Sequence, residues 1–321
     1  MVDFRYHVVS IVAVFLALGI GIVFGTTAIN RAILNDLDRN VDRLTEEKRA
    51  LDAERKLLAD RAGDADEWGK AVYQSLVAGV LSGERVVVVS APGASRSVRD
   101  EVVKQLGLAG ATVTGRIRLS EALTDPGRGA ELDDLVIREL PQGVTLPGTG
   151  STAAERAMAE LAHVLGTESP GSTPPPSLTR VLAALRERGF LAVDGDTVLP
   201  ARNVVVLLPG HSESPSPTPS RAPEEQAPVA VSLVSALARL APRPAVVAVA
   251  PAGGSVTGTE LEDVRADADL KELVSTVDDV DLVFGQTALV LAIDEARRGG
   301  HGHYGDGVGA EAPVPARTPA A

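Results

Sequence analysis

The stretch ERVVVVSAP, residues 84–92, holds four consecutive valines and is followed by RSVRDEVVKQLGLAG at 96–110, an amphipathic segment. Strands that are apolar throughout are typical of sheets covered by helices on both faces. A buried strand followed by a helix is the repeating unit of parallel α/β folds. Residues 84–110 are therefore predicted to form the first such unit.

The same alternation of strands and helices continues along the chain. Further strands are predicted at ATVTGRIRLS (111–120), NVVVLLPG (203–210) and RPAVVAVAP (243–251). Further helices are predicted at 151–166, 177–189, 257–274 and 285–299. Two of these helices begin with a capping box, Thr152 with Glu155 and Thr259 with Glu262. The pattern predicts an α/β domain over 64–300 with a Rossmann-like, mostly parallel sheet.

Proline-rich and polar segments interrupt this pattern. ESPGSTPPPS (168–177) is predicted to be a linker or surface loop. The segment 211–226 is rich in Pro, Ser and Glu, cannot bury a core, and is predicted to be a disordered insertion. Residues 301–321 are read as a Gly/Pro-rich tail, disordered from 308 onward.

The N-terminus carries the most apolar stretch of a chain whose net charge is -12. Val8–Phe24 contains no charged residue and spans about 25 Å as a helix, and the uncharged Gly25–Ile29 extends it to membrane thickness. We interpret 1–29 as an uncleaved transmembrane signal anchor. A cleaved signal peptide is the alternative, but no A-x-A-like site follows the apolar run. Gly21 and Gly25 have the small-xxx-small spacing of packed membrane helices.

The orientation of this anchor has two opposing indicators. Arg31, Arg39 and Arg43 follow the apolar run whereas only Arg5 precedes it, and this count favours a cytoplasmic domain. Long domains, however, are translocated largely regardless of charge, and an apolar segment this close to the N-terminus acts as an export signal. We expect a single-pass protein of the cell membrane with its large domain extracytoplasmic. The absence of cysteine fits either side.

Residues 30–63 have the heptad pattern of a coiled-coil stalk. The apolar a and d positions are Leu34, Leu37, Val41, Leu44, Leu51 and Leu58. Lys48 and Arg55 occupy the remaining a positions, and polar residues there favour low oligomer states. The pattern predicts a parallel homodimer or pairing with the heptads of a partner protein. A lone charged helix packed on its own domain is the alternative.

Motifs for catalysis or nucleotide binding are missing from the sequence. It contains no G-x-G-x-x-G, no P-loop and no G-x-S-x-G, so we expect no enzyme, no bound cofactor and no nucleic-acid partner. The loop SAPGASRS (90–97) precedes the start of a predicted helix, where backbone amides can bind an anion. An anion-binding module is therefore a further, weaker alternative. In GGHGHYGDG, the residues His301, His303 and Asp306 are a candidate loose Cu(II) site, with a plain glycine-rich turn as the alternative.

Three stretches carry a resemblance to a known family. They are DFRYHVVSIVAVFLALGIGIVFGT (3–26), RVVVVSAPG (85–93) and VDDVDLVFGQTALVLAIDEARRGGHGHYG (277–305). Together they resemble the actinobacterial copper transporter family, that of mycobacterial copper transport protein B and its relatives. The resemblance covers residue 1 to about 305 and excludes the insertion.

This resemblance implies an envelope protein linked to copper efflux or tolerance. Mycobacterial members have been proposed to be outer-membrane channels, and a corynebacterial relative is associated with a partner protein in cell separation. One membrane helix cannot line a pore alone, and the soluble part is predicted to be an α/β domain. We therefore expect a membrane-anchored protein of copper homeostasis, with an indirect mechanism left open. The alternative is a non-catalytic scaffold whose coiled coil pairs with a cell-division or cell-wall regulator.

Overall fold

A computed structural model describes most of the chain in two compact units, Met1–Ala65 and Asp66–Ala321. The residues described are 4–148, 150–166, 173–195, 197–210, 228–240, 244–251 and 259–316. In the first helix, the side chains described are those of 6–22, 39–65 and 67–77. The predicted insertion at 211–226 lies outside these residues.

The N-terminal unit consists of the first part of one long helix, whose last residues belong to the second unit. Helix α1 runs from Phe4 to Val77, and its sequence from 26 to 62 contains no glycine or proline to interrupt it. Four of the predicted heptad residues, Val41, Leu44, Leu51 and Leu58, are more than half exposed. The side chains of Gly25, Leu34 and Leu37 lie outside those described, and Gly21 has open space around it. Within the described residues, no helix reaches the length and hydropathy of a membrane span.

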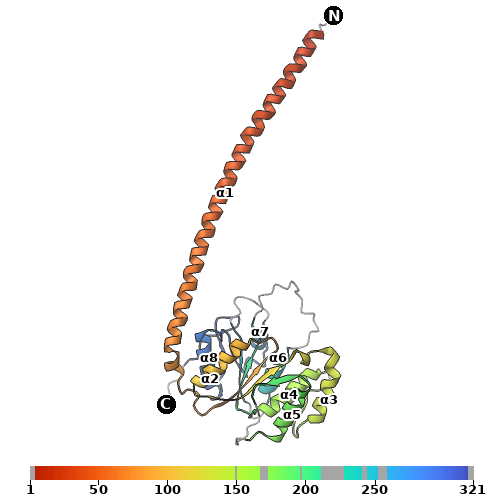
Figure 1. The fold of residues 1–321 in the computed structure, drawn as a ribbon, viewed down its shortest axis with the longest axis vertical. Helices are drawn as coiled ribbons and strands as arrows, with labels where there is room; N and C mark the ends of the chain where they lie inside the picture. Colours follow the sequence, from red (N-terminus) through yellow and green to blue (C-terminus); the bar gives the residue numbers. More distant parts are fainter. Residues whose placement is uncertain are drawn as a thin grey trace. The chain divides into compact units, whose positions relative to one another are not determined.

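A single sheet forms the centre of the second unit (Figure 1). The strands described are β1 (Arg85–Ser90), β2 (Thr112–Leu119), β3 (Leu191–Val193), β4 (Asn203–Leu207), β5 (Ala245–Val249), β6 (Ser275–Val277) and β7 (His303–Tyr304). Their order is β3-β2-β1-β4-β5-β6-β7, and all neighbours are parallel except β2 and β3. The direction of winding reverses between β1 and β4, as in doubly wound folds. The predicted Rossmann-like, mostly parallel sheet is confirmed.

Helices cover both faces of this sheet. They are α2 (Arg96–Leu108), α3 (Gly129–Glu139), α4 (Ala153–Gly166), α5 (Pro176–Glu187), α6 (Val229–Ala238), α7 (Glu260–Ala266) and α8 (Val283–Ala296), with short 3-10 turns at Glu121–Leu123 and Pro126–Arg128. One core cluster combines Val87 and Val89 of β1 with helices α3 to α7. The other combines Val86 and Val88 with α2, α8 and the end of α1. The run of valines is therefore buried on both faces, which explains why it lacks alternation.

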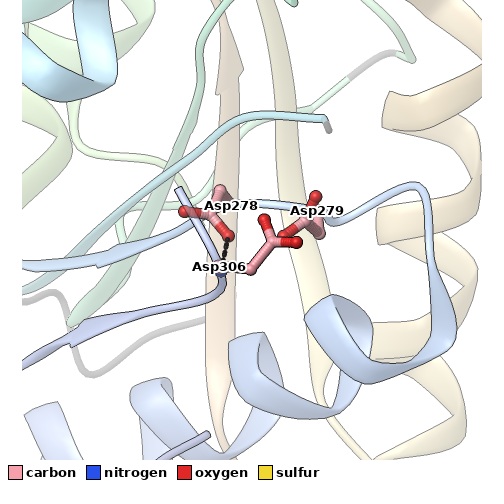
Figure 2. A group of neighbouring side chains, drawn as sticks. All are labelled: Asp278, Asp279 and Asp306. Atoms are coloured by element: carbon pink, nitrogen blue, oxygen red, sulfur yellow. Dashed lines mark hydrogen bonds between the residues drawn. The ribbon is translucent and has the colours of Figure 1, made fainter. Parts of the chain in front are cut away.

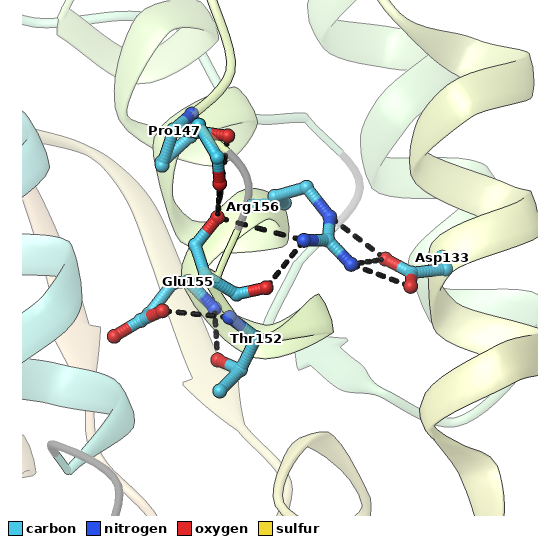
Figure 3. Close-up of polar contacts among 7 residues, drawn as sticks. Asp133, Pro147, Thr152, Glu155 and Arg156 are labelled. Atoms are coloured by element: carbon cyan, nitrogen blue, oxygen red, sulfur yellow. Dashed lines mark hydrogen bonds and ion pairs between the residues drawn. The ribbon is translucent and has the colours of Figure 1, made fainter.

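The capping box predicted at the start of α4 is present (Figure 3). The Thr152 backbone N–H donates to Glu155 Oε2 at 2.7 Å, and the Glu155 N–H donates to Thr152 Oγ1 at 3.1 Å. Arg156, the next residue, donates from Nε to Asp133 Oδ1 at 2.9 Å and so joins α4 to α3. At the second predicted box, the Glu262 N–H donates to Thr259 Oγ1 at 3.3 Å, which caps the start of α7.

The C-terminal segment differs from its prediction as a tail. His303–Tyr304 pairs with β6 as the last strand of the sheet, beyond the domain end placed at 300. The Glu311 N–H donates to the His303 carbonyl at 2.7 Å, and the Gly305 N–H donates to the Ala312 carbonyl at 3.0 Å. The predicted disorder from 308 is therefore corrected as far as Ala312, because backbone hydrogen bonds fasten this segment to the sheet.

Candidate functional site

The carboxyl ends of β4 to β7 converge at one edge of the sheet. Ligands of doubly wound folds bind at this edge, near the reversal of strand order. The residues that follow these strands include Pro209, Ala250, Asp278 and Asp306, and all four line one small pocket. This edge is therefore where a site is expected.

Three aspartates meet in this pocket and are called here the acidic cluster (Figure 2). Asp278 and Asp279 follow β6, and Asp306 follows β7. One carboxylate oxygen from each residue lies within 4.8 Å of those of the other two. Asp278 and Asp279 are buried, whereas Asp306 is exposed. In the described part of the chain, no other group of three or more His, Asp or Glu residues has ligand atoms this close together.

Asp278 is held by donors on several sides. Arg265 Nη1 donates to its Oδ2 at 2.9 Å, the Gly307 N–H to Oδ2 at 3.1 Å, and the Asp306 N–H to Oδ1 at 3.0 Å. Burial acts to raise the pKa of Asp278, but hydrogen bonding to Asp279 and Arg265 and the charge of Arg265 outweigh it and lower the pKa. Asp278 is therefore the ionised member whose charge is already balanced.

Arg265 is fixed in turn by the surrounding backbone. Its Nε donates to Thr276 Oγ1 at 2.7 Å, its Nη2 to the Tyr304 carbonyl at 2.9 Å, and its Nη1 to the Val308 carbonyl at 3.0 Å. A planar guanidinium satisfied on all sides keeps a fixed orientation. Arg265 thus locks β6, β7 and the C-terminal segment around Asp278.

Asp279 occupies an unfavourable environment. Its backbone φ is 57°, which is a left-handed conformation that residues other than Gly, Asn and Asp rarely adopt. It is 3% exposed, and its buried Oδ2 has no hydrogen-bond partner among the described residues. Burial is the largest of the causes that raise the pKa of Asp279. Hydrogen bonding to Asp278 and Asp306, and repulsion by their negative charges, raise it further.

The first turn of α8 packs directly beneath this residue. A Cβ on Gly285 would lie 2.2 Å from the Asp279 carbonyl oxygen, so only glycine fits there. The Leu282 N–H donates to the same carbonyl at 2.8 Å. Close packing of α8 therefore holds the strained backbone of Asp279 in place.

The pocket at the acidic cluster is small. Its volume is about 30 Å³, which is room for one ion or one or two waters and not for a nucleotide. A larger groove of about 750 Å³ lies along α4 and α6 and includes Glu155, His163 and Arg239. None of the unpartnered buried polar atoms among the described residues lines that groove. The acidic cluster is therefore the stronger candidate site.

The predicted copper residues lie near this pocket but do not converge. His303 is buried in β7, with Nδ1 at 2.9 Å from Thr276 Oγ1, and burial is the main cause that lowers its pKa. His301 Nε2 lies 3.5 Å from Glu272 Oε2. Asp306 alone belongs to the acidic cluster. A loose Cu(II) site at His301, His303 and Asp306 remains a prediction.

Asp278 and Asp279 are not among the residues predicted from the sequence. The candidate loops follow long valine-rich strands, whereas β6, which precedes this pair, comprises only Ser275–Val277. A usable signal was present, because the acidic pair directly follows the β-branched residues Thr276 and Val277 and precedes a helix. Acidic side chains at the carboxyl end of a parallel strand point to the ligand edge of the sheet.

Fold and site define a class: a doubly wound α/β protein with a long N-terminal helix, an acidic cluster at the ligand edge and no dinucleotide or P-loop motif in its sequence. A family model described as "Copper transport outer membrane protein, MctB" matches residues 1–315. The chain belongs to this MctB family.

Curated relatives match along nearly the full chain. Copper transporter MctB of Mycobacterium tuberculosis is 32% identical over 327 aligned residues, which cover 97% of this chain and 98% of the relative. Copper transporter MctB of Mycobacterium leprae is 29% identical over 319 residues, with the same coverage. The resemblance seen in three stretches of sequence is thus confirmed over the whole length.

Proposed function

We propose that this protein is a membrane-tethered envelope protein of copper homeostasis whose α/β domain lies outside the cytoplasmic membrane and acts through partners rather than as an enzyme. The observation that carries this proposal is the alignment of relatives named copper transporters along 97% of the chain, together with a family model that matches residues 1–315 and so includes the apolar N-terminus. The family description adds an outer-membrane copper transport role.

The N-terminal segment supports a lipid tether. Val8–Phe24 contains no charged residue, and the apolar side chains described there, such as Phe15 and Leu16, are largely exposed. A contiguous apolar surface of this kind requires cover from lipid or protein. A tether on the N-terminal side leaves the α/β domain free to engage another envelope component.

The ligand chemistry supports an indirect role in copper handling. Cu(I) favours thiolate and thioether ligands, and the sequence has no cysteine and only two methionines. Met158 is fully buried in the core, and the acidic cluster offers only oxygen ligands. The protein is therefore proposed to need no copper cofactor of its own.

A scaffold that pairs its stalk with a second copy or a partner is the second candidate function. The specific observation is the exposed seam formed by Val41, Leu44, Leu51 and Leu58, which occupy heptad a and d positions at intervals of 3, 7 and 7 residues on one continuous helix. Apolar residues at this spacing pack as knobs into the holes of a facing helix. A pairing stalk is also the simplest means by which the tethered protein could act through partners.

Complementation of a deletion strain tests both ideas together. Leu44→Asp with Leu51→Asp places two charges on the seam, whereas Leu57→Asp places one on an exposed residue outside it. We expect the seam variant to lose copper tolerance and self-association or partner capture, and the Leu57 variant to keep them. Full copper tolerance in a strain carrying the seam variant would contradict action through the stalk.

Copper titration of the purified full-length protein tests the indirect mechanism. We expect no specific Cu(II) binding by calorimetry. Stoichiometric binding that is abolished by His301→Ala, an accessible position, would show direct handling and contradict the proposal.

A further inference from the structure

The acidic cluster has three carboxyl groups but only one cationic partner among the described residues. Arg265 forms an ion pair with Asp278 at 2.9 Å. Among the described residues, neither Asp279 nor Asp306 forms an ion pair with a basic side chain. Two carboxyl groups of the three therefore have no cationic partner in the described part of the chain.

The buried member of this unbalanced pair is Asp279. Its carboxylate lines the pocket, and its Oδ2 is buried without a hydrogen-bond partner in the described part of the chain. Burial of a polar atom that bonds to nothing is costly, and buried carboxylates in proteins are paired or coordinate a cation. The unpartnered oxygen is therefore an acceptor available to a cation in the pocket.

We propose that the acidic cluster is a binding site for one hard divalent cation of the Mg²⁺ or Ca²⁺ class, with Asp279 and Asp306 as its principal ligands. Oxygen ligands select these ions, whereas copper sites favour nitrogen and sulfur. The site lies in the α/β domain; it shares Asp306 with the copper site predicted from sequence but includes neither His301 nor His303.

The geometry of the cluster fits this occupant. Oxygens on opposite sides of a Ca²⁺ ion are about 4.8 Å apart, because each oxygen lies about 2.4 Å from the metal. The three carboxylate oxygens lie within 4.8 Å of one another, and the pocket of about 30 Å³ has room for one ion. Asp278, fastened by Arg265 and two backbone N–H groups, positions the other two carboxylates.

The surrounding backbone brings the last ligand into place. Asp306 lies between two glycines, and a Cβ on Gly305 would lie 1.4 Å from Asp278 Oδ1. The chain after β7 can therefore pass directly over Asp278 only with glycine at 305. This close approach places the Asp306 carboxylate beside that of Asp279.

Calorimetric titration of full-length protein, purified in detergent and stripped with EDTA, tests the proposal with CaCl₂ and MgCl₂ as separate probes. The wild type is expected to bind one ion per chain and to unfold at a higher temperature when it is bound. Asp279→Asn and Asp306→Asn are expected to weaken binding at least tenfold. Asp281→Asn, which removes an exposed acid two residues away, is the matched control and is expected to bind as the wild type does.

The outcomes separate a cation from a shared proton. Asparagine tolerates the φ of Asp279, and Asp306 is exposed, so at least the second variant is expected to fold. If neither ion binds the wild type at millimolar concentration, or if both variants bind as tightly as the wild type, the proposal is overturned. An Asp279→Asn protein that is more stable than a metal-indifferent wild type would assign a proton to the cluster and also overturn it.

Discussion

Glu160 is a residue whose environment opposes its charge. It lies on α4 with 0% exposure, and both carboxylate oxygens are buried without a hydrogen-bond partner among the described residues. Burial raises the pKa of Glu160 to about 7, and the negative charge of Glu139 adds to this increase. The positive charge of Arg180 acts in the opposite direction. The side chain is therefore protonated in the folded protein at mildly acidic pH.

This residue should make the stability of the domain fall as pH rises. The pKa of Glu160 is about 7 in the folded protein and 4.5 in the unfolded chain, so the folded state binds the proton more tightly. Its stabilising effect is complete below about pH 4.5 and lost by about pH 7, a difference of about 3 kcal/mol at most. We expect Glu160→Gln to be more stable than wild type at pH 8 and similar at pH 4.

Chemical denaturation at both pH values measures this difference. Glu187→Gln, an exposed position at the end of α5, serves as the control and should keep the wild-type dependence. If the free energy of unfolding of the Glu160 variant changed with pH as it does in the wild type, the Glu160 carboxyl would not be the cause of the pH dependence.

At the residue scale, sequence analysis identifies local hydrogen bonds better than long-range clusters. Thr152 and Glu155 are three positions apart, and their reciprocal bonds follow from that spacing alone. Asp278 and Asp306 meet only because β6 and β7 are neighbours in the sheet. No spacing rule brings together residues that belong to different strands, so the acidic cluster required the fold.

The start of α4 is the element whose stability is easiest to test. Thr152 Oγ1 accepts from the Glu155 N–H, one of the helix N–H groups that has no partner within the helix. We expect Thr152→Ala to lower the free energy of unfolding by about 1 kcal/mol, and Thr152→Ser to retain most of it. Thermal or chemical denaturation distinguishes the two variants. Equal losses would mean that the methyl group matters and the cap does not.

At the element scale, length decided which strands could be predicted. β1, β4 and β5 have five or six residues with central valines, and the apolar pattern identified all three. β6 and β7 have three and two residues, which is too short for any periodicity. Their conformation depends on backbone pairing with β5 and with each other, as in the bond from the Thr276 N–H to the Gly302 carbonyl.

The tether and the direction of insertion concern the whole molecule. The chain contains no cysteine, so Glu187→Cys introduces a single thiol at an exposed position. We expect a membrane-impermeant maleimide to label this thiol in intact cells, and the labelled chain to sediment with membranes until detergent is added. Labelling that occurs only after lysis would place the α/β domain in the cytoplasm.

A chain with residues 1–29 deleted is the control for the tether. We expect it to remain in the soluble fraction. Membrane association of this deleted chain would show that another part of the molecule binds the membrane. Sequence analysis could predict the apolar segment because it is contiguous, but the arginine count and the export signal gave opposite orientations.

The seventh strand has a consequence for how the protein is made. A ribosome reaches His303, Tyr304 and Asp306 only after all the other described strands and helices have been synthesised. A premature stop codon just before His303 would remove β7, the carbonyls of Tyr304 and Val308 that accept from Arg265, and the Asp306 carboxylate. The backbone groups of β6 that pair with β7 would then be left without their partners. Nascent chains therefore complete this corner of the domain last, and fragments released early should be good substrates for proteases.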